Sequence, residues 1–271
     1  MDDRPIGIFD SGLGGLSCLK ALRRRLPDER LIYFGDTART PYGSKRPSTI
    51  LSFSDEIVRF LLKQDVKLIM IACNTVSSTC LSDLEERYPE LPFIGTIKPM
   101  VSELAEKLRE DSRLGIIGTR VTIASDMYPT LLHAARPELY IVQRACPLFV
   151  PLVEEGFEHT ELMRLSIRHY MDAFVHEERL THLLLGCTHY PLIEEDIAKE
   201  YPELEILDPA ASMAREVEET LKQRDALAAP PKKEKDIFFA SDLSENFVRM
   251  ISSIMGDQDA HIFSETLGGL S

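Results

Sequence analysis

Two similar stretches, "KLIMIACNTVSS" (67–78) and "THLLLGCTHYPL" (181–192), decide how the rest of the chain is interpreted. Each is a short apolar run that leads into a cysteine followed by amide, hydroxyl or imidazole side chains. Such a run is typical of a buried strand in a parallel sheet, and the polar residues then belong to the turn into the next helix. Both stretches therefore predict a strand whose carboxyl end presents a thiol.

Further apolar runs alternate with amphipathic stretches along the whole chain, such as "LSCLKALRRRL" and "STILSFSDEIVRFLLKQ". This alternation predicts an α/β fold in which parallel strands are joined by crossover helices. We expect strands at 6–9, 31–34, 68–72, 93–97, 114–118, 139–143, 182–186, 204–207 and 236–240.

The two halves of the chain resemble each other. Cys73 aligns with Cys187 at an offset of 114 residues, and Gly7 with Gly115 at 108. A third match, "ERYPEL" with "KEYPEL", has an offset of 113. Any two strand-helix units look alike, but three matches at nearly one offset indicate an internal duplication.

We therefore expect two similar lobes, each a mainly parallel sheet flanked by helices, related by a pseudo-twofold axis with the active site between them. The predicted first domain comprises residues 1–97 and 209–271, and the second comprises residues 98–208. The first is discontinuous because the last predicted strand and helix, after the linker-like "LAAPPKKEKD", have no counterpart in the repeat. We expect them to complete the first sheet.

Composition excludes several classes of protein. A formal net charge of −13 disfavours nucleic acid as the primary ligand, because the phosphate backbone would be repelled. No apolar run is long enough to cross a membrane, and "MDDRPIGIFD" enters a strand without a basic region or cleavage site. We expect a cytoplasmic protein with no membrane contact.

Cofactor motifs are also missing from the sequence. Five cysteines without a C-x-x-C pair disfavour a disulfide framework, a dithiol redox site and the usual zinc spacing. The glycine-rich "DSGLGGLS" fails the dinucleotide-binding pattern because Ser17 stands at its sixth position. We expect neither a metal nor a cofactor.

Polar side chains cluster where the predicted strands end. Ligands of parallel α/β sheets bind at the carboxyl ends of the strands, close to the N-termini of the following helices. The side chains expected there are Asp10, Ser11, Pro41, Tyr42, Gly43, Cys73, Asn74, Thr75, Thr119, Thr122, Cys187, Thr188 and His189. Their hydroxyl and amide groups suit the carboxylates and ammonium of an amino acid, although the same residue types are common helix N-caps.

The two lobes would place Cys73 and Cys187 on opposite walls of one cleft. Inverting a carbon centre by proton transfer requires one group that removes a proton and another that supplies one from the opposite face. A thiol must be activated for this task, and we expect a helix N-terminus behind each sulfur. His189 would exchange a proton with Cys187, and Asp10 with Cys73. The alternative for either cysteine alone is an inert core residue.

Six stretches together carry a resemblance to a known family: "GIFDSGLGGLS", "YFGDTARTPYGSKRP", "IACNTVSS", "GIIGTRVTI", "CPLFVPLVEEG" and "LLLGCTHYPLI". In this order they resemble glutamate racemases of the cofactor-independent aspartate/glutamate racemase superfamily, from about residue 5 to about residue 209. The resemblance implies an isomerase that interconverts L- and D-glutamate for peptidoglycan synthesis, without pyridoxal phosphate or metal, as a homodimer.

The resemblance also implies roles for individual residues. Cys73 and Cys187 would be the two acid/base groups, assisted by Asp10, Glu154 and His189. The substrate would be held by Ser11, Pro41, Tyr42, Gly43, Asn74, Thr75, Thr119, Thr122 and Thr188. For Glu154 the sequence by itself fits solvent exposure and a place in the cleft equally well.

Three other functions stay open from the sequence. The same machinery would serve an aspartate racemase, since the sequence does not reveal the depth of the pocket. A hydrolase or acyltransferase would use Cys187 as nucleophile and His189 as base, leaving Cys73 without a role. A non-enzymatic amino-acid-binding module would need neither thiol.

Overall fold

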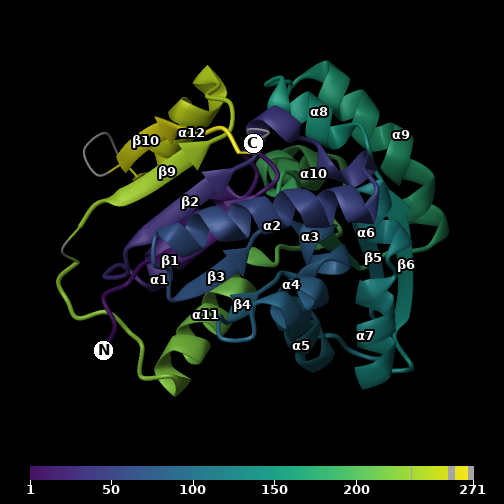
Figure 1. Cartoon of the computed structure of the whole chain (residues 1–271). Helices are drawn as coiled ribbons and strands as arrows, with labels where there is room; N and C mark the ends of the chain where they lie inside the picture. The colour runs from purple at the N-terminus through teal and green to yellow at the C-terminus, as the bar shows by residue number, and fades with distance from the viewer. Residues whose placement is uncertain (233, 256–259, 268–271) are drawn as a thin grey trace.

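The computed structural model describes residues 1–232, 234–255 and 260–267, and it contains two parallel sheets flanked by helices (Figure 1). The first sheet has the strand order β10-β9-β2-β1-β3-β4, and the second has the order β6-β5-β7-β8. The α/β fold with two lobes, predicted from the sequence, is confirmed. The strands are β1 (Ile6–Asp10), β2 (Leu31–Gly35), β3 (Leu68–Ile71), β4 (Phe93–Ile94), β5 (Arg113–Gly118), β6 (Tyr140–Ala145), β7 (His182–Gly186), β8 (Glu205–Leu207), β9 (Asp236–Ala240) and β10 (Ala260–Ser264).

Twelve α-helices and three short 3-10 helices occur in the described part of the chain. The α-helices are α1 (Leu16–Arg25), α2 (Pro47–Lys63), α3 (Asn74–Thr79), α4 (Leu81–Arg87), α5 (Ile97–Lys107), α6 (Arg120–Ala124), α7 (Met127–Ala135), α8 (Phe149–Glu154), α9 (Glu161–Glu177), α10 (Glu194–Glu200), α11 (Ala210–Gln223) and α12 (Glu245–Met255). The 3-10 helices are η1 (Thr37–Arg39), η2 (Tyr42–Ser44) and η3 (Tyr190–Ile193).

The predicted set of strands needs two corrections. The run expected at 93–97 pairs with β3 only through Phe93 and Ile94, because the backbone then turns into α5 with Thr96 as its N-cap. The strand expected to be the last, β9, is followed by β10, which the sequence analysis missed. β10 is an edge strand of five residues, and its sequence "AHIFS" contains too few apolar residues to stand out.

The repeat found in the sequence is also present in the arrangement of the strands. The order β2-β1-β3-β4 in the first sheet corresponds to β6-β5-β7-β8 in the second. Gly7 in β1 lies opposite Ile69 in β3, and Gly115 in β5 lies opposite Leu183 in β7, so the register is also the same. Because β3 and β7 are equivalent, the cysteines that follow them start from equivalent positions.

The chain crosses between the lobes twice. Helix α5 follows β4 and packs against α7 of the second lobe, whereas α11 follows β8 and packs against α1 of the first. Strands β9 and β10 then extend the first sheet beside β2, and Figure 1 shows them in yellow-green at its outer edge. The boundaries at residues 97/98 and 208/209 stay a prediction, and residues 233, 256–259 and 268–271 of the predicted first domain lie outside the described residues.

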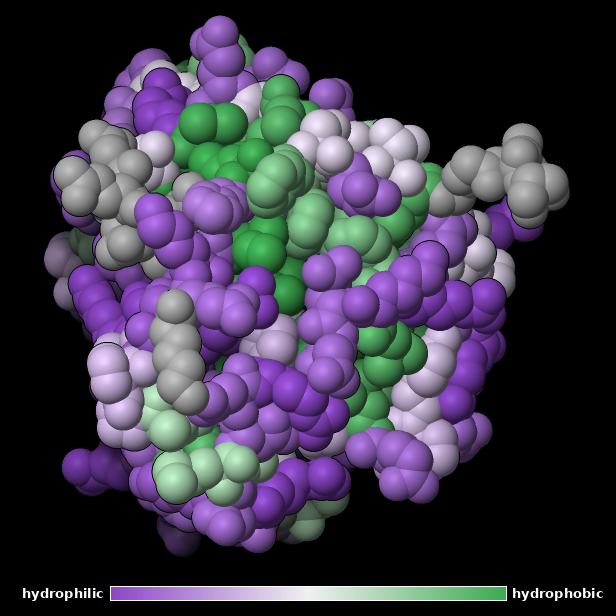
Figure 2. All heavy atoms as spheres, turned by 60° about the vertical axis from the view of Figure 1, so that its left-hand side comes forward, coloured by the Kyte–Doolittle hydropathy of each residue, from purple (hydrophilic) through white to green (hydrophobic). Residues whose placement is uncertain are grey.

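Several large apolar side chains are exposed. They include Leu148 just before α8, Phe157 in the loop before α9, and Leu162 and Leu165 on α9. Figure 2 views the side of the molecule where β9, β10 and α12 lie, and apolar residues gather in its upper part. Among the described residues, no helix is long and apolar enough to cross a membrane.

Candidate active site

One small pocket lies between the lobes, where the carboxyl ends of strands from both sheets meet. It is lined by Ser11, Pro41, Tyr42, Gly43, Cys73, Asn74, Thr75, Thr119, Val150, Cys187, Thr188 and His189. Of these, only Val150 was not predicted from the sequence. The other three predicted residues lie in contact with this lining: Asp10 and Glu154 bond to Thr188 and His189, and Thr122 bonds to Thr75.

The pocket is nearly closed in this structure. Its free volume is about 10 Å³, which is on the order of the space needed by one water molecule. An amino acid can therefore enter only if the two lobes or their loops move apart. Larger cavities exist elsewhere, but their walls lack cysteine.

Cys73 is the thiol of the first lobe. It follows β3, forms the N-cap of α3 and is 4% exposed. Its Sγ lies 3.6 Å from Ser11 Oγ, and the backbone N–H of Val76 donates to it. Burial, followed by the charge of Asp10, raises the pKa of Cys73 to about 12, although Val76 and Ser11 act in the opposite direction. Cys73 is therefore a protonated thiol at neutral pH.

Cys187 is the thiol of the second lobe, and its surroundings differ. Its Sγ lies 3.9 Å from His189 Nδ1, and His189 Nε2 lies 2.5 Å from Glu154 Oε1. Burial is the largest single effect on His189 and lowers its pKa, but Cys187 and Glu154 together outweigh burial and raise the pKa well above 6.5. The imidazole is thus placed to hold a proton beside the sulfur of Cys187.

The expected helix N-terminus behind Cys187 is not present. The chain continues from Cys187 through Thr188 and His189 into the 3-10 helix η3, and an α-helix begins only at Glu194. Pro191 occupies the first turn of η3 and cannot donate a backbone N–H. A side-chain imidazole therefore takes the place near Cys187 that a helix dipole takes near Cys73.

Asp10 lies under the floor of the pocket and is fully buried. Its Oδ2 accepts hydrogen bonds from the backbone N–H groups of Gly12 and Gly15, each at 3.1 Å, and its Oδ1 accepts from Thr188 Oγ1 at 3.2 Å. Burial raises the pKa of Asp10. Among the described residues it has no hydrogen bond to Cys73, and the proton exchange expected between the two stays a prediction.

The glycine-rich turn after β1 lets the second lobe come close. A Cβ on Gly14 would lie 2.6 Å from His189 Nδ1 and 2.7 Å from Thr188 Oγ1. Any side chain at this position would push the loop of Cys187 away from the first lobe. The turn thus allows close packing between the lobes.

Three threonine hydroxyls meet across the lobe boundary. Thr75 Oγ1 lies 3.0 Å from Thr119 Oγ1 and 3.3 Å from Thr122 Oγ1. Thr119 also accepts a hydrogen bond from the backbone N–H of Thr122 and so caps α6. Capping and ligand binding, the two interpretations of such residues, are compatible at Thr119.

Further residues hold those that line the pocket, and the sequence analysis did not assign them to the site. The hydroxyl of Tyr42 donates to Asp36 Oδ2, which also accepts from Arg39 Nε at 2.7 Å. Asn74 Oδ1 accepts hydrogen bonds from Thr96 and Tyr128. Asp36 follows a strand and obeys the strand-end rule, whereas nothing in the sequence links Thr96 or Tyr128 to Asn74.

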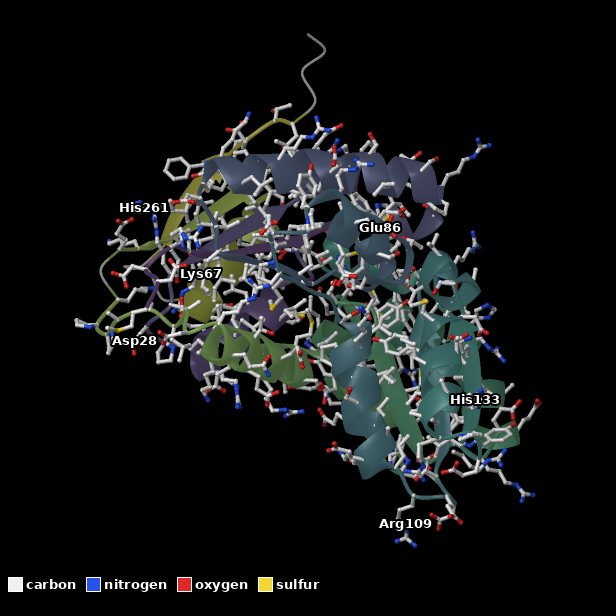
Figure 3. All side chains as sticks on the ribbon, turned by 60° about the horizontal axis from the view of Figure 1, so that its bottom comes forward. Asp28, Lys67, Glu86, Arg109, His133 and His261 are labelled. Carbon is white, nitrogen blue, oxygen red and sulfur yellow. The ribbon has the colours of Figure 1, made fainter. Side chains whose placement is uncertain are left out.

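Among the described residues, no group of three or more His, Cys, Asp and Glu side chains is placed to hold a metal ion. Figure 3 shows His133 on the outer part of the second lobe and His261 at the far end of the first. Neither histidine lines the pocket.

Comparison with known proteins agrees with this arrangement. Residues 15–217 match the family model described as Asp/Glu/Hydantoin racemase. Glutamate racemases of Chlorobaculum tepidum and Geobacter metallireducens are 43% and 40% identical, over 94% and 97% of both chains respectively. The crystal structure of Francisella tularensis glutamate racemase in complex with D-glutamate superposes with a TM-score of 0.88 at 34% identity, covering 99% of this chain and 98% of that one.

The two-lobed α/β fold and these relatives define an amino-acid racemase, an isomerase. Since the family model covers most of the chain and close relatives cover nearly all of it, this chain belongs to the Asp/Glu/hydantoin racemase family.

Proposed function

We propose that this protein interconverts L- and D-glutamate by transferring protons between Cys73, Cys187 and the α-carbon of the substrate. One observation carries the proposal: two cysteines from equivalent positions of two duplicated lobes line a single pocket. A substrate held between two such walls would expose opposite faces of its α-carbon to different thiols.

The surroundings of the two thiols suggest how they divide the reaction. Cys187 has His189 beside it to take its proton, so it would act as the base that removes the α-proton of L-glutamate. Cys73, whose pKa is about 12, keeps its proton and would deliver it to the opposite face. In the reverse direction Cys73 would be the base toward D-glutamate.

The remaining residues would hold the substrate. The hydroxyl and amide groups of Ser11, Asn74, Thr75, Thr119 and Thr188 line the pocket and suit its carboxylates and ammonium. Thr122 would support Thr75 and Thr119, and Pro41, Tyr42 and Gly43 would form the wall contributed by η2. Asp10, Glu154 and His189 would assist proton transfer from behind the pocket.

Glutamate is preferred over aspartate as the substrate because the relatives at 40% identity and above are glutamate racemases, and the Francisella neighbour was crystallised with D-glutamate. Comparing kcat/KM for the two amino acids separates these possibilities. The hydrolase or acyltransferase alternative would need Cys187 as a nucleophile. It predicts an acyl-enzyme that mass spectrometry would detect, and it gives Cys73 no task.

We further propose that the enzyme supplies D-glutamate for peptidoglycan in the cytoplasm and acts as a homodimer. The exposed apolar side chains beside α8 and on α9 offer one surface for a second copy. Analytical ultracentrifugation tests this point, and a monomer at micromolar concentration would contradict it.

The two-base mechanism is tested by racemisation in deuterated water. With L-glutamate as substrate, the first D-glutamate formed should carry deuterium, because it receives its proton from a different thiol that has exchanged with solvent. The remaining L-glutamate should stay protiated. Equally fast deuteration of both enantiomers would indicate a single base and overturn the mechanism.

Substitution of each pocket cysteine is a second test of the two-base mechanism. Cys73→Ser and Cys187→Ser should each lose racemisation, because a serine hydroxyl is a far weaker acid than a thiol. Cys80→Ser and Cys146→Ser are matched controls, since these cysteines are buried in the first and second lobe but do not line the pocket. Full activity of either pocket variant would refute its assignment.

A further inference from the structure

We propose that Tyr128 and Thr96 are positioning residues that lock the Asn74 side-chain amide with its N–H groups toward the pocket, so that Asn74 recognises a carboxylate of the substrate. This inference rests on the proposed glutamate racemase function and adds two residues to it. Neither Tyr128 nor Thr96 lines the pocket itself.

The geometry at Asn74 fixes the orientation of its amide. Thr96 Oγ1 donates to Asn74 Oδ1 at 3.0 Å, and the hydroxyl of Tyr128 donates to the same oxygen at 2.8 Å. A carbonyl oxygen has two lone pairs, so these two donors saturate it. The amide nitrogen cannot accept either bond, so a rotated amide would have to turn both hydroxyls from donors into acceptors.

The other end of the amide is left for a ligand. Asn74 lines the pocket and is 3% exposed. Across residues 1–232, 234–255 and 260–267, no protein group accepts a hydrogen bond from Asn74 Nδ2, and this atom is not among the fully enclosed polar atoms without a partner. Two N–H donors are thus directed at the space where substrate binds. Such a group favours an acceptor such as a carboxylate and disfavours an ammonium.

Thr96 does not cap its own helix with its side chain. It is the N-cap of α5, where a threonine oxygen usually accepts from the helix backbone, but its side chain makes no capping hydrogen bond. Its hydroxyl is fully buried and donates to Asn74 instead.

Tyr128 adds a link between the lobes. It belongs to α7 of the second lobe and is 1% exposed, whereas Asn74 begins α3 of the first lobe. Burial raises the pKa of Tyr128, so its hydroxyl keeps the proton that it donates. The amide is therefore fully oriented only when the two lobes are together.

The central experiment measures the kinetics of Tyr128→Phe, which removes one hydroxyl and keeps the ring. A freed amide would spend part of its time with Oδ1 toward the substrate carboxylate. Because binding of the ground state and of the transition state would suffer alike, KM for both enantiomers should rise about 5- to 20-fold while kcat stays within about twofold. Thr96→Val should behave similarly, and Thr96→Ser, which retains the donor, should restore the parent KM.

Controls separate positioning from simple stability. Tyr201→Phe is the matched variant: Tyr201 is buried in the second lobe, and its hydroxyl donates to Asp172 away from the pocket. It should lower the melting temperature as much as Tyr128→Phe does but leave KM unchanged. In an Asn74→Ala background, Tyr128→Phe should have no further effect on KM, because the residue through which it acts is gone.

An unchanged KM in Tyr128→Phe and Thr96→Val, or additive effects of Tyr128→Phe and Asn74→Ala, would overturn the inference. If the parent protein does not racemise glutamate, the proposed function fails separately. Calorimetric titration of D-glutamate into the same variants then tests the inference, with a weaker Kd expected in place of a higher KM and an unchanged Kd refuting it.

Discussion

At the scale of single residues, the two thiols are equivalent by position but different in chemistry. Burial and the nearby charge of Asp10 keep Cys73 protonated, although Ser11 and the start of α3 favour the thiolate. Cys187 has an imidazole at 3.9 Å that is itself supported by Glu154. The two sulfurs occupy equivalent positions of the repeat, and it is the side chains around them that differ.

The raised pKa of Cys73 predicts how the thiol reacts with an alkylating reagent. Only the thiolate attacks iodoacetamide, so alkylation of Cys73 in a Cys187→Ser variant should accelerate about tenfold for each pH unit. Because its pKa is about 12, no plateau should appear up to about pH 10. Mass spectrometry of the Cys73 peptide measures the rate.

The remaining buried cysteines set the background of this measurement. A variant lacking both pocket thiols, Cys73→Ser/Cys187→Ser, should show only slow labelling, since Cys18, Cys80 and Cys146 are buried. A plateau in the rate of Cys73 labelling at or below about pH 9 would contradict the assigned environment.

At the scale of elements, the pocket depends on close contacts between η2 of the first lobe and the start of α6 in the second. Gly43 lies in η2 and faces Thr119, the N-cap of α6. The hydroxyl cluster of Thr119 with Thr75 spans the same boundary at 3.0 Å. Elements from both lobes therefore close the pocket, and a substrate must compete with contacts that the lobes make with each other.

Gly43→Ala should move η2 away from the start of α6. A Cβ at Gly43 would overlap the Cβ of Thr119, and neither atom is the end of a flexible side chain. The loop must shift, and kcat/KM should fall by about 10- to 100-fold. The fall must be equal for both enantiomers, since these have equal free energies in solution. Steady-state kinetics by circular dichroism measures both directions.

Gly7→Ala is the control for this prediction. Gly7 lies in β1 of the same lobe, and its added Cβ would approach only side-chain atoms of the core at 3.2 Å or more. It should lower the melting temperature with little change in KM. Unaltered kinetics of Gly43→Ala would show that the contact of η2 with Thr119 does not shape the pocket.

At the scale of the whole molecule, the two lobes are joined by packing and by the returning chain. One cluster of buried apolar residues extends from Ile6 and Leu13 in the first lobe to Phe149 and Leu185 in the second. At the end of the first sheet where its strands begin, Lys67 binds the N-terminal segment of the chain and the segment that follows α11. Figure 3 shows Lys67 near Asp28 in the first lobe, far from Arg109 in the second.

Lys67→Met should destabilise the protein strongly. Lys67 Nζ lies 2.6 Å from Glu29 Oε2 and donates to the backbone carbonyls of Asp2 and Ala226, and both charged side chains are at most 2% exposed. Removing the lysine leaves a buried, unpaired carboxylate, which costs about 3–5 kcal/mol. Equilibrium unfolding in urea measures the change in free energy.

Two further variants bracket this value. Lys67→Met/Glu29→Leu should recover much of the loss, because no unpaired charge remains. Lys98→Met removes an exposed partner of Glu85 at 3.7 Å and should cost less than about 1 kcal/mol. If Lys67→Met and Lys98→Met lowered the free energy of unfolding by similar amounts, the buried pair of Lys67 and Glu29 would not stabilise the segment that returns to the first lobe.

The sequence by itself determined the features that depend on local pattern. The spacing of apolar runs specified nine of the strands, since burial on both faces of a parallel sheet demands uninterrupted apolar residues. The repeat identified Cys73 and Cys187 as equivalent, and strand ends located most of the residues that line the pocket. The sequence analysis missed β10 because an edge strand is only partly buried and needs no uninterrupted apolar run.

Only the tertiary structure decided which side chains face each other across the lobes. The partnership of Asn74 with Tyr128, the hydroxyl cluster at Thr119 and the closure of the pocket join residues separated by tens of positions, and no local rule encodes such pairs. The pKa of Cys73 likewise results from burial and neighbouring charge, which exist only once the chain is folded.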